Sequence, residues 1–98
     1  MNHKYILQYV LEATRGGPTR RRIMDVLLET PSNANKLAQV LKMDYKTIQH
    51  NIAVLEKNKI ISAVNKGSYG AMYFVHDELR QFLEINRDES GKTLINKK

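Results

Sequence analysis

Residues 33–58, NANKLAQVLKMDYKTIQHNIAVLEKN, contain two amphipathic helical patterns with almost nothing between them. The first runs through ANKLAQVL and is expected to be anchored by Leu37, Val40 and Leu41. The second begins after Asp44, which has the side chain of a helix N-cap. Its core-facing stripe is predicted to be Ile48, Ile52 and Leu55. Because KM forms the whole link, the pattern predicts a helix-turn-helix whose later helix is presented outward.

The opposite face of residues 45–57 is rich in hydrogen-bond donors and contains no acid before Glu56. Gln49 can make a bidentate contact with adenine, and Lys46 can reach either guanine or a phosphate. The hydroxyl and imidazole groups beside them can donate or accept hydrogen bonds at base edges in the major groove. Tyr45 is expected at the DNA backbone, with a structural place close to the core as the alternative. We expect DNA bases to be read by Lys46, Thr47, Gln49 and His50.

The net charge of the chain is +6, and it is unevenly distributed. Residues 15–69 contain ten Lys and Arg against four Asp and Glu, whereas residues 77–91 contain five acids against two bases. A basic middle beside an acidic segment favours one polyanion-binding surface over a general solubility charge. The side chains expected to contact the DNA backbone are Arg20, Arg21, Arg22, Tyr45, Lys57, Lys66, Ser68 and Tyr69.

Arg20, Arg21 and Arg22 are predicted to lie in the first turn of a helix, where the helix dipole disfavours cations. A bound phosphate would compensate for this position, because arginine grips phosphate with two parallel hydrogen bonds. The alternative is that one or two of the arginines pair with Asp25 or Glu29 along the same helix.

Two further helices are predicted before the helix-turn-helix. Residues 3–13 place apolar side chains at helical spacing, and the glycines and proline of TRGGP end that helix. Thr19 is expected to cap a second helix that runs to Glu29. Ser32 or Asn33 is then expected to cap the helix that follows. The buried positions expected in the second helix are Ile23, Met24, Leu27 and Leu28.

The periodicity of the sequence changes after Asn58. IISAVN and AMYFV are strand-length runs of β-branched or aromatic residues, and the glycines of the intervening KGSYG supply a turn. The pattern predicts a β-hairpin whose tip, with Lys66, Ser68 and Tyr69, reaches DNA; an ordinary polar turn is the alternative. HDELRQFLEINRD then returns to a helical pattern.

The predicted fold class is therefore mainly α with a small β-hairpin: a winged helix-turn-helix with flanking N- and C-terminal helices. Residues 1–89 form the domain, and residues 90–98 are expected to be a flexible basic tail. A monomer of this size covers the apolar side of its terminal helices only partly, which favours a two-fold dimer over enclosure of a small ligand. The expected dimer interface is Tyr5, Ile6, Tyr9, Val10, Leu79, Phe82 and Leu83.

The segment RGGPTRRRIMDVLLETPSNANKLAQVLKMDYKTIQHNIAVLEKNKII, followed by YGAMYF, resembles the ArsR-like winged-helix transcription regulators, particularly small archaeal members. The resemblance covers residues 3–87 and implies a DNA-binding regulator with residues 44–57 as the recognition helix and the terminal helices in a dimer. The chain departs from the metal-sensing members because it has no cysteine box. The family's recognition helix usually ends in glycine, and here Asn58 is expected to supply the left-handed cap.

Several classes of function are disfavoured by what the sequence lacks. With no cysteine, the chain has no disulfides and no thiolate metal sites. The three histidines are far apart, so a metal site would have to be assembled across a dimer. No nucleophile with a base, no paired carboxylates and no phosphate-binding glycine loop are evident, so we expect neither an enzyme nor a cofactor. Without a membrane-length apolar run or a signal-peptide core, we expect a cytoplasmic protein.

The leading hypothesis is a sequence-specific transcriptional regulator that binds an inverted repeat in double-stranded DNA as a homodimer. The alternative is a winged-helix interaction module of a transcription or replication complex, in which the transcription machinery is the partner and the basic face meets an acidic protein. A small-molecule sensor is a third hypothesis, compatible with the first. The amide, imidazole and hydroxyl groups of residues 46–57 favour DNA, because they suit base edges better than simple charge neutralisation.

Overall fold

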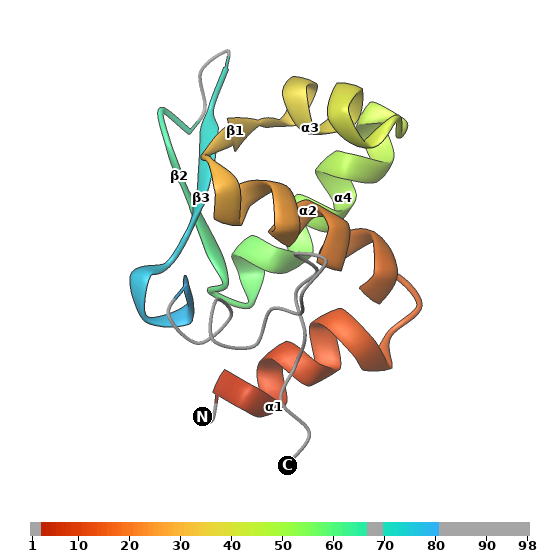
Figure 1. Cartoon of the computed structure of the whole chain (residues 1–98), viewed down its shortest axis with the longest axis vertical. Helices are drawn as coiled ribbons and strands as arrows, with labels where there is room; N and C mark the ends of the chain where they lie inside the picture. Colours follow the sequence, from red (N-terminus) through yellow and green to blue (C-terminus); the bar gives the residue numbers. More distant parts are fainter. Residues whose placement is uncertain (1–2, 67–69, 81–98) are drawn as a thin grey trace.

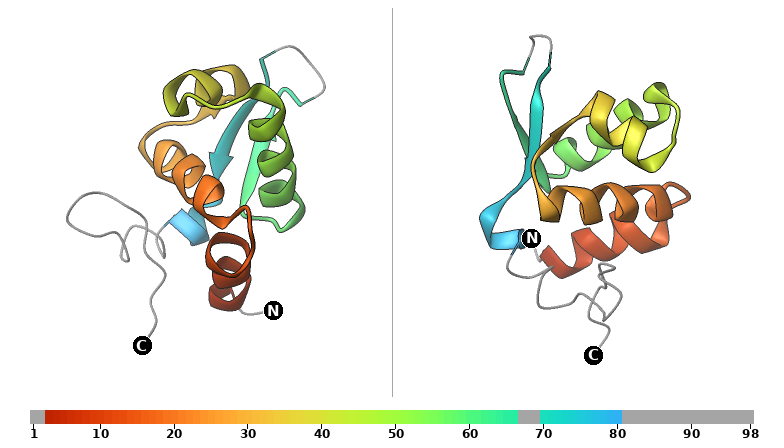
Figure 2. Two further views of the ribbon diagram at one scale, coloured as in Figure 1. Left: turned by 90° about the vertical axis from the view of Figure 1, so that its right-hand side faces the viewer. Right: turned by 45° about the horizontal axis from the view of Figure 1, so that its top comes forward.

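The protein is represented by a computed structural model that describes residues 3–66 and 70–80 of the 98-residue chain. Its elements are α1 (His3–Gln8), the π-helical η1 (Tyr9–Ala13), α2 (Gly17–Glu29), β1 (Ser32–Asn33), α3 (Ala34–Leu41), α4 (Tyr45–Lys57), β2 (Ile61–Val64) and β3 (Met72–Val75). The strands lie along one side of α2, α3 and α4, and α1 lies beneath α2 (Figure 1). Two further views show the position of α1 below α2 from other sides (Figure 2). The predicted winged helix-turn-helix is confirmed.

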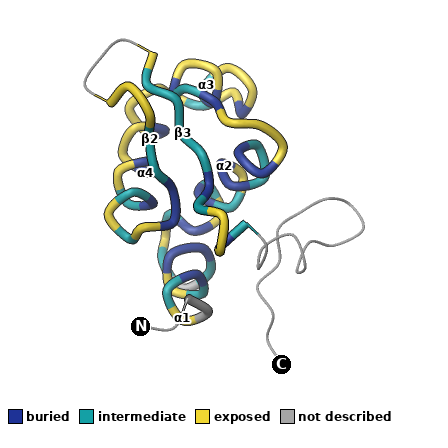
Figure 3. Tube along the Cα trace, turned by 90° about the vertical axis from the view of Figure 1, so that its left-hand side faces the viewer, coloured by how far each residue is buried: buried dark blue, intermediate teal, exposed yellow. Residues whose placement is uncertain are grey.

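The hydrophobic core is built around α2, which contacts η1, α3, α4 and β3. The two-stranded β2–β3 hairpin joins this core mainly at one end, because Ile61 and Val75 are buried whereas Val64 is exposed. Figure 3 shows the same gradient, with the tube dark blue where β2 begins and β3 ends, and teal or yellow toward their other ends. All the buried positions predicted for α2 are confirmed, and they are Ile23, Met24, Leu27 and Leu28.

Both helices of the helix-turn-helix begin at the predicted caps. The Asn33 side-chain oxygen accepts a hydrogen bond from the Lys36 backbone N–H at 2.8 Å. Asp44 Oδ2 accepts from the Thr47 backbone N–H at 3.1 Å. In the turn between the helices, Lys42 has a φ of 55°, a left-handed conformation more usual for glycine or asparagine. These local interactions fix where α4 starts relative to α3.

The sheet contains a strand that the sequence did not predict. The strand order is β1-β3-β2, with both pairs antiparallel. Ser32 pairs with Tyr73, and Asn33 pairs with Met72. Ser32 and Asn33 are polar and show no sequence pattern typical of a strand. They form β1 because the chain passes beside β3 at this point. This pairing ties the start of α3 to the wing.

Two predicted helix ends are wrong. The helix α2 begins at Gly17, before Thr19, because Gly16 occupies the N-cap position and a proline lies within the first turn. At the end of α4, Asn58 has a φ of −90° and the left-handed residue is Lys59, with a φ of 63°. The Asn58 side chain instead donates a hydrogen bond to the Val54 carbonyl at 2.8 Å.

Three apolar side chains lie in places that the sequence did not predict. Val40 was expected to anchor α3, but its side of the helix faces outward and it is 52% exposed. Val10 and Leu79 were expected in a dimer interface, but both are buried in the core of this chain. Val10 lies in η1, where π-helical winding changes the angle between successive side chains and so the residues that face α2.

Because η1 lies close to α2 at Gly17, we expect any side chain at this position to lower the stability of the fold. A Cβ at Gly17 would lie 2.5 Å from the Leu11 carbonyl oxygen, so Gly17→Ala should lower the free energy of unfolding by about 1–3 kcal/mol through overpacking. Thr19→Ala should change it by less than about 0.5 kcal/mol, because Thr19 does not cap the helix. Denaturant unfolding measures both variants; a larger loss for Thr19→Ala than for Gly17→Ala would contradict this account.

Candidate nucleic-acid interface

The helix α4 presents two chemically opposite faces. Its predicted core stripe is confirmed, since Ile48, Ile52 and Leu55 are all buried. The helix is held further by its packing against α3 and β2. The four side chains expected to read bases are all exposed, and they are Lys46, Thr47, Gln49 and His50. The structure therefore gathers these four groups on one accessible surface, which we call the α4 face.

Tyr45 belongs to this exposed surface and contacts one of its members. Gln49 Nε2 donates a hydrogen bond to the Tyr45 hydroxyl oxygen at 3.1 Å, one helical turn back. The Tyr45 side chain is exposed, so it does not lie in the core. The bond orients the Gln49 amide along the α4 face. Lys57, at the end of the helix, is exposed as well.

The three arginines of α2 have different surroundings. Arg20 is only 5% exposed, and its Nε donates to the Val10 carbonyl oxygen at 2.9 Å. Arg21 is half-buried, whereas Arg22 is exposed and donates from Nη2 to the Leu41 carbonyl oxygen at 3.2 Å. The prediction that Arg20 contacts the DNA backbone is therefore wrong.

The physical reason lies in the neighbouring helix end. Arg20 does sit near the positive end of α2, as expected, but a phosphate is not what compensates for this position. The negative end of η1 lies against Arg20, and the Val10 carbonyl belongs to its last turn. Burial lowers the pKa of Arg20, because it removes water from the guanidinium.

Asn51 is a buried polar residue of α4 that the sequence reading missed. It is 4% exposed, and its Oδ1 accepts a hydrogen bond from Arg20 Nη1 at 2.8 Å. Its Nδ2 donates to the Thr47 carbonyl oxygen at 2.9 Å. The signal in the sequence was its position, one residue before Ile52 and three after Ile48, which places an amide on the core side of the helix.

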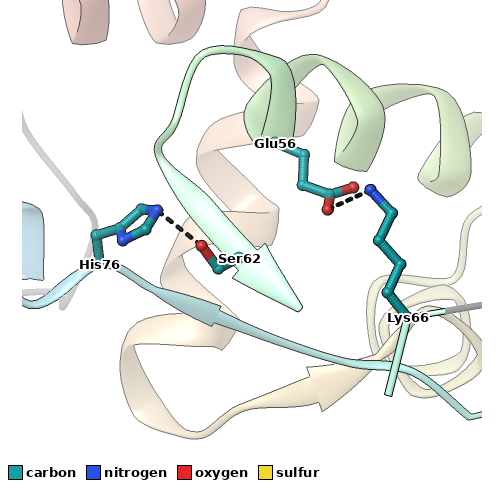
Figure 4. Close-up of polar contacts among 4 residues, drawn as sticks. All are labelled: Glu56, Ser62, Lys66 and His76. Carbon is teal, nitrogen blue, oxygen red and sulfur yellow. Dashed lines mark hydrogen bonds and ion pairs between the residues drawn. The ribbon is translucent and has the colours of Figure 1, made fainter. Parts of the chain in front are cut away.

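The wing is joined to α4 by an ion pair. Lys66 Nζ lies 2.7 Å from Glu56 Oε2, and Figure 4 shows the lysine reaching from beyond β2 to the last turn of α4. The hydrogen bond with Glu56 raises the pKa of Lys66. At the other end of the strands, Ser62 Oγ and His76 Nε2 are 2.8 Å apart (Figure 4). Two other expected wing contacts, Ser68 and Tyr69, lie outside the described residues.

The expected dimer residues divide into four groups, of which the first is the buried pair Val10 and Leu79. Tyr5 and Tyr9 are 69% and 64% exposed, although both are large aromatic side chains. Ile6 is half-buried against the core. Phe82 and Leu83 lie outside the described residues, as do the remainder of the expected C-terminal helix and the basic tail at residues 90–98.

Within residues 3–66 and 70–80, no cluster of three or more His, Cys, Asp or Glu side chains could hold a metal ion. Over the same residues, no helix has both the length and the apolar character needed to cross a membrane.

Comparison with known proteins identifies one relative by sequence and several by structure. No protein-family model matches the chain. An uncharacterised helix-turn-helix transcriptional regulator of Methanocaldococcus jannaschii is 31% identical over 71 residues, which cover 71% of this chain and 80% of the relative.

The structural relatives are winged helix-turn-helix proteins of low sequence identity. A homodimeric winged helix-turn-helix DNA-binding domain from Mycobacterium bovis, a possible ArsR-family regulator, superimposes with a TM-score of 0.68 at 17% identity and covers 83% of this chain and 71% of that one. The transcriptional regulator HlyU from Vibrio vulnificus has a TM-score of 0.70 at 12% identity, covering 83% and 80%. The repressor BigR from Xylella fastidiosa has a TM-score of 0.65 at 18% identity, covering 81% and 77%.

Proposed function

The chain belongs to the helix-turn-helix transcriptional regulators, with the winged-helix fold of their ArsR-like members, and we propose that it reads a specific double-stranded DNA site through α4. The observation that carries this proposal is the α4 face. Lysine, hydroxyl, amide and imidazole groups share one exposed side of a helix whose other side is buried. The major groove of B-DNA admits an α-helix and displays the donors and acceptors that such groups recognise.

Gln49 is the side chain best suited to base discrimination. Its amide can accept from adenine N6 and donate to adenine N7 at the same time. The bond to Tyr45 uses one of the two hydrogens on Nε2, which leaves the second hydrogen and Oε1 available for such a pair. Lys46 adds a positive donor for guanine or phosphate beside it.

Backbone contacts are proposed for exposed cations on α4, at the end of β2 and on α2. Lys57 and Lys66 are exposed, and Arg22 is exposed on α2. Phosphate contacts of this kind supply affinity and set the register of the protein on DNA without reading sequence. Arg20 is not among them, because its guanidinium is buried.

We further propose a homodimer that binds an inverted repeat. Two exposed tyrosines on the N-terminal helix, Tyr5 and Tyr9, form an apolar surface that a second copy can cover. One relative of similar fold is itself homodimeric. In a two-fold dimer the two α4 helices would meet successive major grooves, so the half-sites should be about one helical turn apart.

Substitutions on the two sides of α4 should separate base recognition from folding. Gln49→Ala and His50→Ala should leave the melting temperature nearly unchanged, because both side chains are exposed. Each lost base contact should cost about 1–3 kcal/mol of binding to the preferred site and relax base choice at one position per half-site. Ile52→Ala should instead cost roughly 2–5 kcal/mol of folding stability, because it removes buried methylenes.

Thermal unfolding and quantitative DNA binding measure this contrast. If Gln49→Ala and His50→Ala both bind the preferred DNA site with wild-type affinity but lose binding to a protein partner, the protein is an interaction module and does not read DNA through α4.

The second prediction concerns the ion pair at the wing. Glu56→Gln removes the acid that neutralises Lys66 but leaves the lysine charged, so binding to any DNA should become tighter. The slope of log K against log salt should steepen by roughly one per subunit. Glu78→Gln is the matched control, because it makes the same charge change beyond the other end of β3. Equal effects of both variants would show that only net charge matters.

The third prediction concerns self-association. Tyr5→Ser combined with Tyr9→Ser should raise the dimer dissociation constant by about tenfold or more, because aromatic side chains dominate the energetics of such interfaces. Val40→Ser removes another exposed apolar side chain, on α3, and should leave association unchanged. Sedimentation is the measurement; a wild-type protein that stays monomeric at micromolar concentration, with and without DNA, would disprove the dimer.

A further inference from the structure

A chain of buried and part-buried hydrogen bonds connects the N-terminal helix to the centre of α4. Arg20 Nε donates to the Val10 carbonyl at 2.9 Å, and its Nη2 donates to the Thr14 hydroxyl. Its Nη1 donates to Asn51 Oδ1 at 2.8 Å. Asn51 Nδ2 then donates to the Thr47 carbonyl at 2.9 Å. One guanidinium therefore touches both η1 and α4, and we call the group Arg20, Asn51, Thr14 and Val10 the Arg20 joint.

The sequence around the joint is built to accommodate it. Gly16 lies beside the guanidinium, and a Cβ there would collide with Arg20 Nη1 and lie 3.0 Å from Asn51 Oδ1. Glycine at this position therefore leaves room for the Arg20–Asn51 bond. From the sequence, the RGGP segment could be interpreted only as a helix break. In the structure, its Gly16 also leaves room for the buried Arg20 side chain.

The joint contributes little net stability for the desolvation that it requires. Its acceptors are a carbonyl, a hydroxyl and an amide, all neutral, whereas Arg20 is a cation removed from water. Replacing buried ionic groups by apolar ones of similar size is often neutral or stabilising, and the best-attested benefit of keeping them is a unique register. Apolar burial decides which side of a helix faces the core, whereas hydrogen bonds depend on the angle between donor and acceptor and so constrain the rotation of the helix more narrowly.

We propose that Arg20 and Asn51 are positioning residues that fix the rotation of α4 about its own axis relative to the N-terminal helix. Arg20 holds α4 at Asn51. The Asn51 amide is in turn fixed within α4 by its bond to the carbonyl of Thr47, one of the residues expected to read DNA. If the N-terminal helices pair across the two-fold axis, this rotation sets how the two α4 faces are aimed at two half-sites. The inference rests on the proposed DNA-binding dimer, and it assigns to the joint the choice of half-site spacing.

The test uses the full-length protein and synthetic inverted repeats that differ only in half-site spacing. Each added base pair rotates one half-site by roughly 35° about the DNA axis, so a rigid dimer should prefer one spacing by roughly tenfold over its neighbours. In the double variant with Arg20→Met and Asn51→Leu, that preference should fall to about threefold or less, while binding to a single half-site changes little.

The matched control is Asn58→Leu. Asn58 also donates its amide to a carbonyl four residues back on α4, but to the Val54 carbonyl and away from Arg20. This control should keep the wild-type spacing preference. If the double variant loses stability and affinity but keeps the spacing preference, the joint is only structural and the inference is wrong. A wild-type protein that binds DNA without any spacing preference would contradict the proposed DNA-binding dimer itself.

A second measurement examines the joint without DNA or substitution. The Arg20 Nε–H should exchange with solvent more slowly than that of the exposed Arg15 in nuclear magnetic resonance spectra, because it is buried and bonded to Val10. Gly16→Ala should abolish this protection and shift the amide signals of residues 47–55. Equal exchange of Arg20 and Arg15 in the wild type would overturn the inference, even if the proposed DNA binding holds.

Discussion

Burial of one narrow aliphatic stripe determines what this protein can present to a partner. Ile48, Ile52 and Leu55 turn one side of α4 into the core, and this burial directs Gln49 and His50 outward. A rotation of α4 by one residue would place polar groups in the core, where each unpaired one costs about 1–3 kcal/mol. The core stripe and the α4 face are thus two consequences of a single packing choice.

The helix-turn-helix could be predicted because its signals are local. Asn33 and Asp44 cap their helices through backbone groups three residues away, and the apolar period marks the buried side. The role of Arg20 could not be predicted in this way, because two of its three partners lie 10 and 31 residues away in the chain. Strand β1 likewise depends on β3, which follows it by about forty residues and carries the only strand-like sequence of the pair.

The charge pattern of the sequence predicted a basic surface but could not show which cations are buried, paired or free to contact DNA. Arg20 is buried against a helix end, Lys66 is paired with Glu56, and Lys46 and Lys57 stand exposed on α4. Composition cannot separate these cases, because burial and pairing depend on the folded neighbours. The α4 face was more predictable, since helical spacing alone places Lys46, Gln49 and His50 opposite the core stripe.

Sequence reading by the α4 face can be measured by selecting bound sequences from a random pool of double-stranded DNA with the purified wild-type protein. We expect an enriched inverted repeat, with adenine or guanine at fixed positions in each half-site and centres about one helical turn apart. Recovery of DNA without any sequence enrichment, at a salt concentration where the protein still binds, would contradict sequence reading by the α4 face.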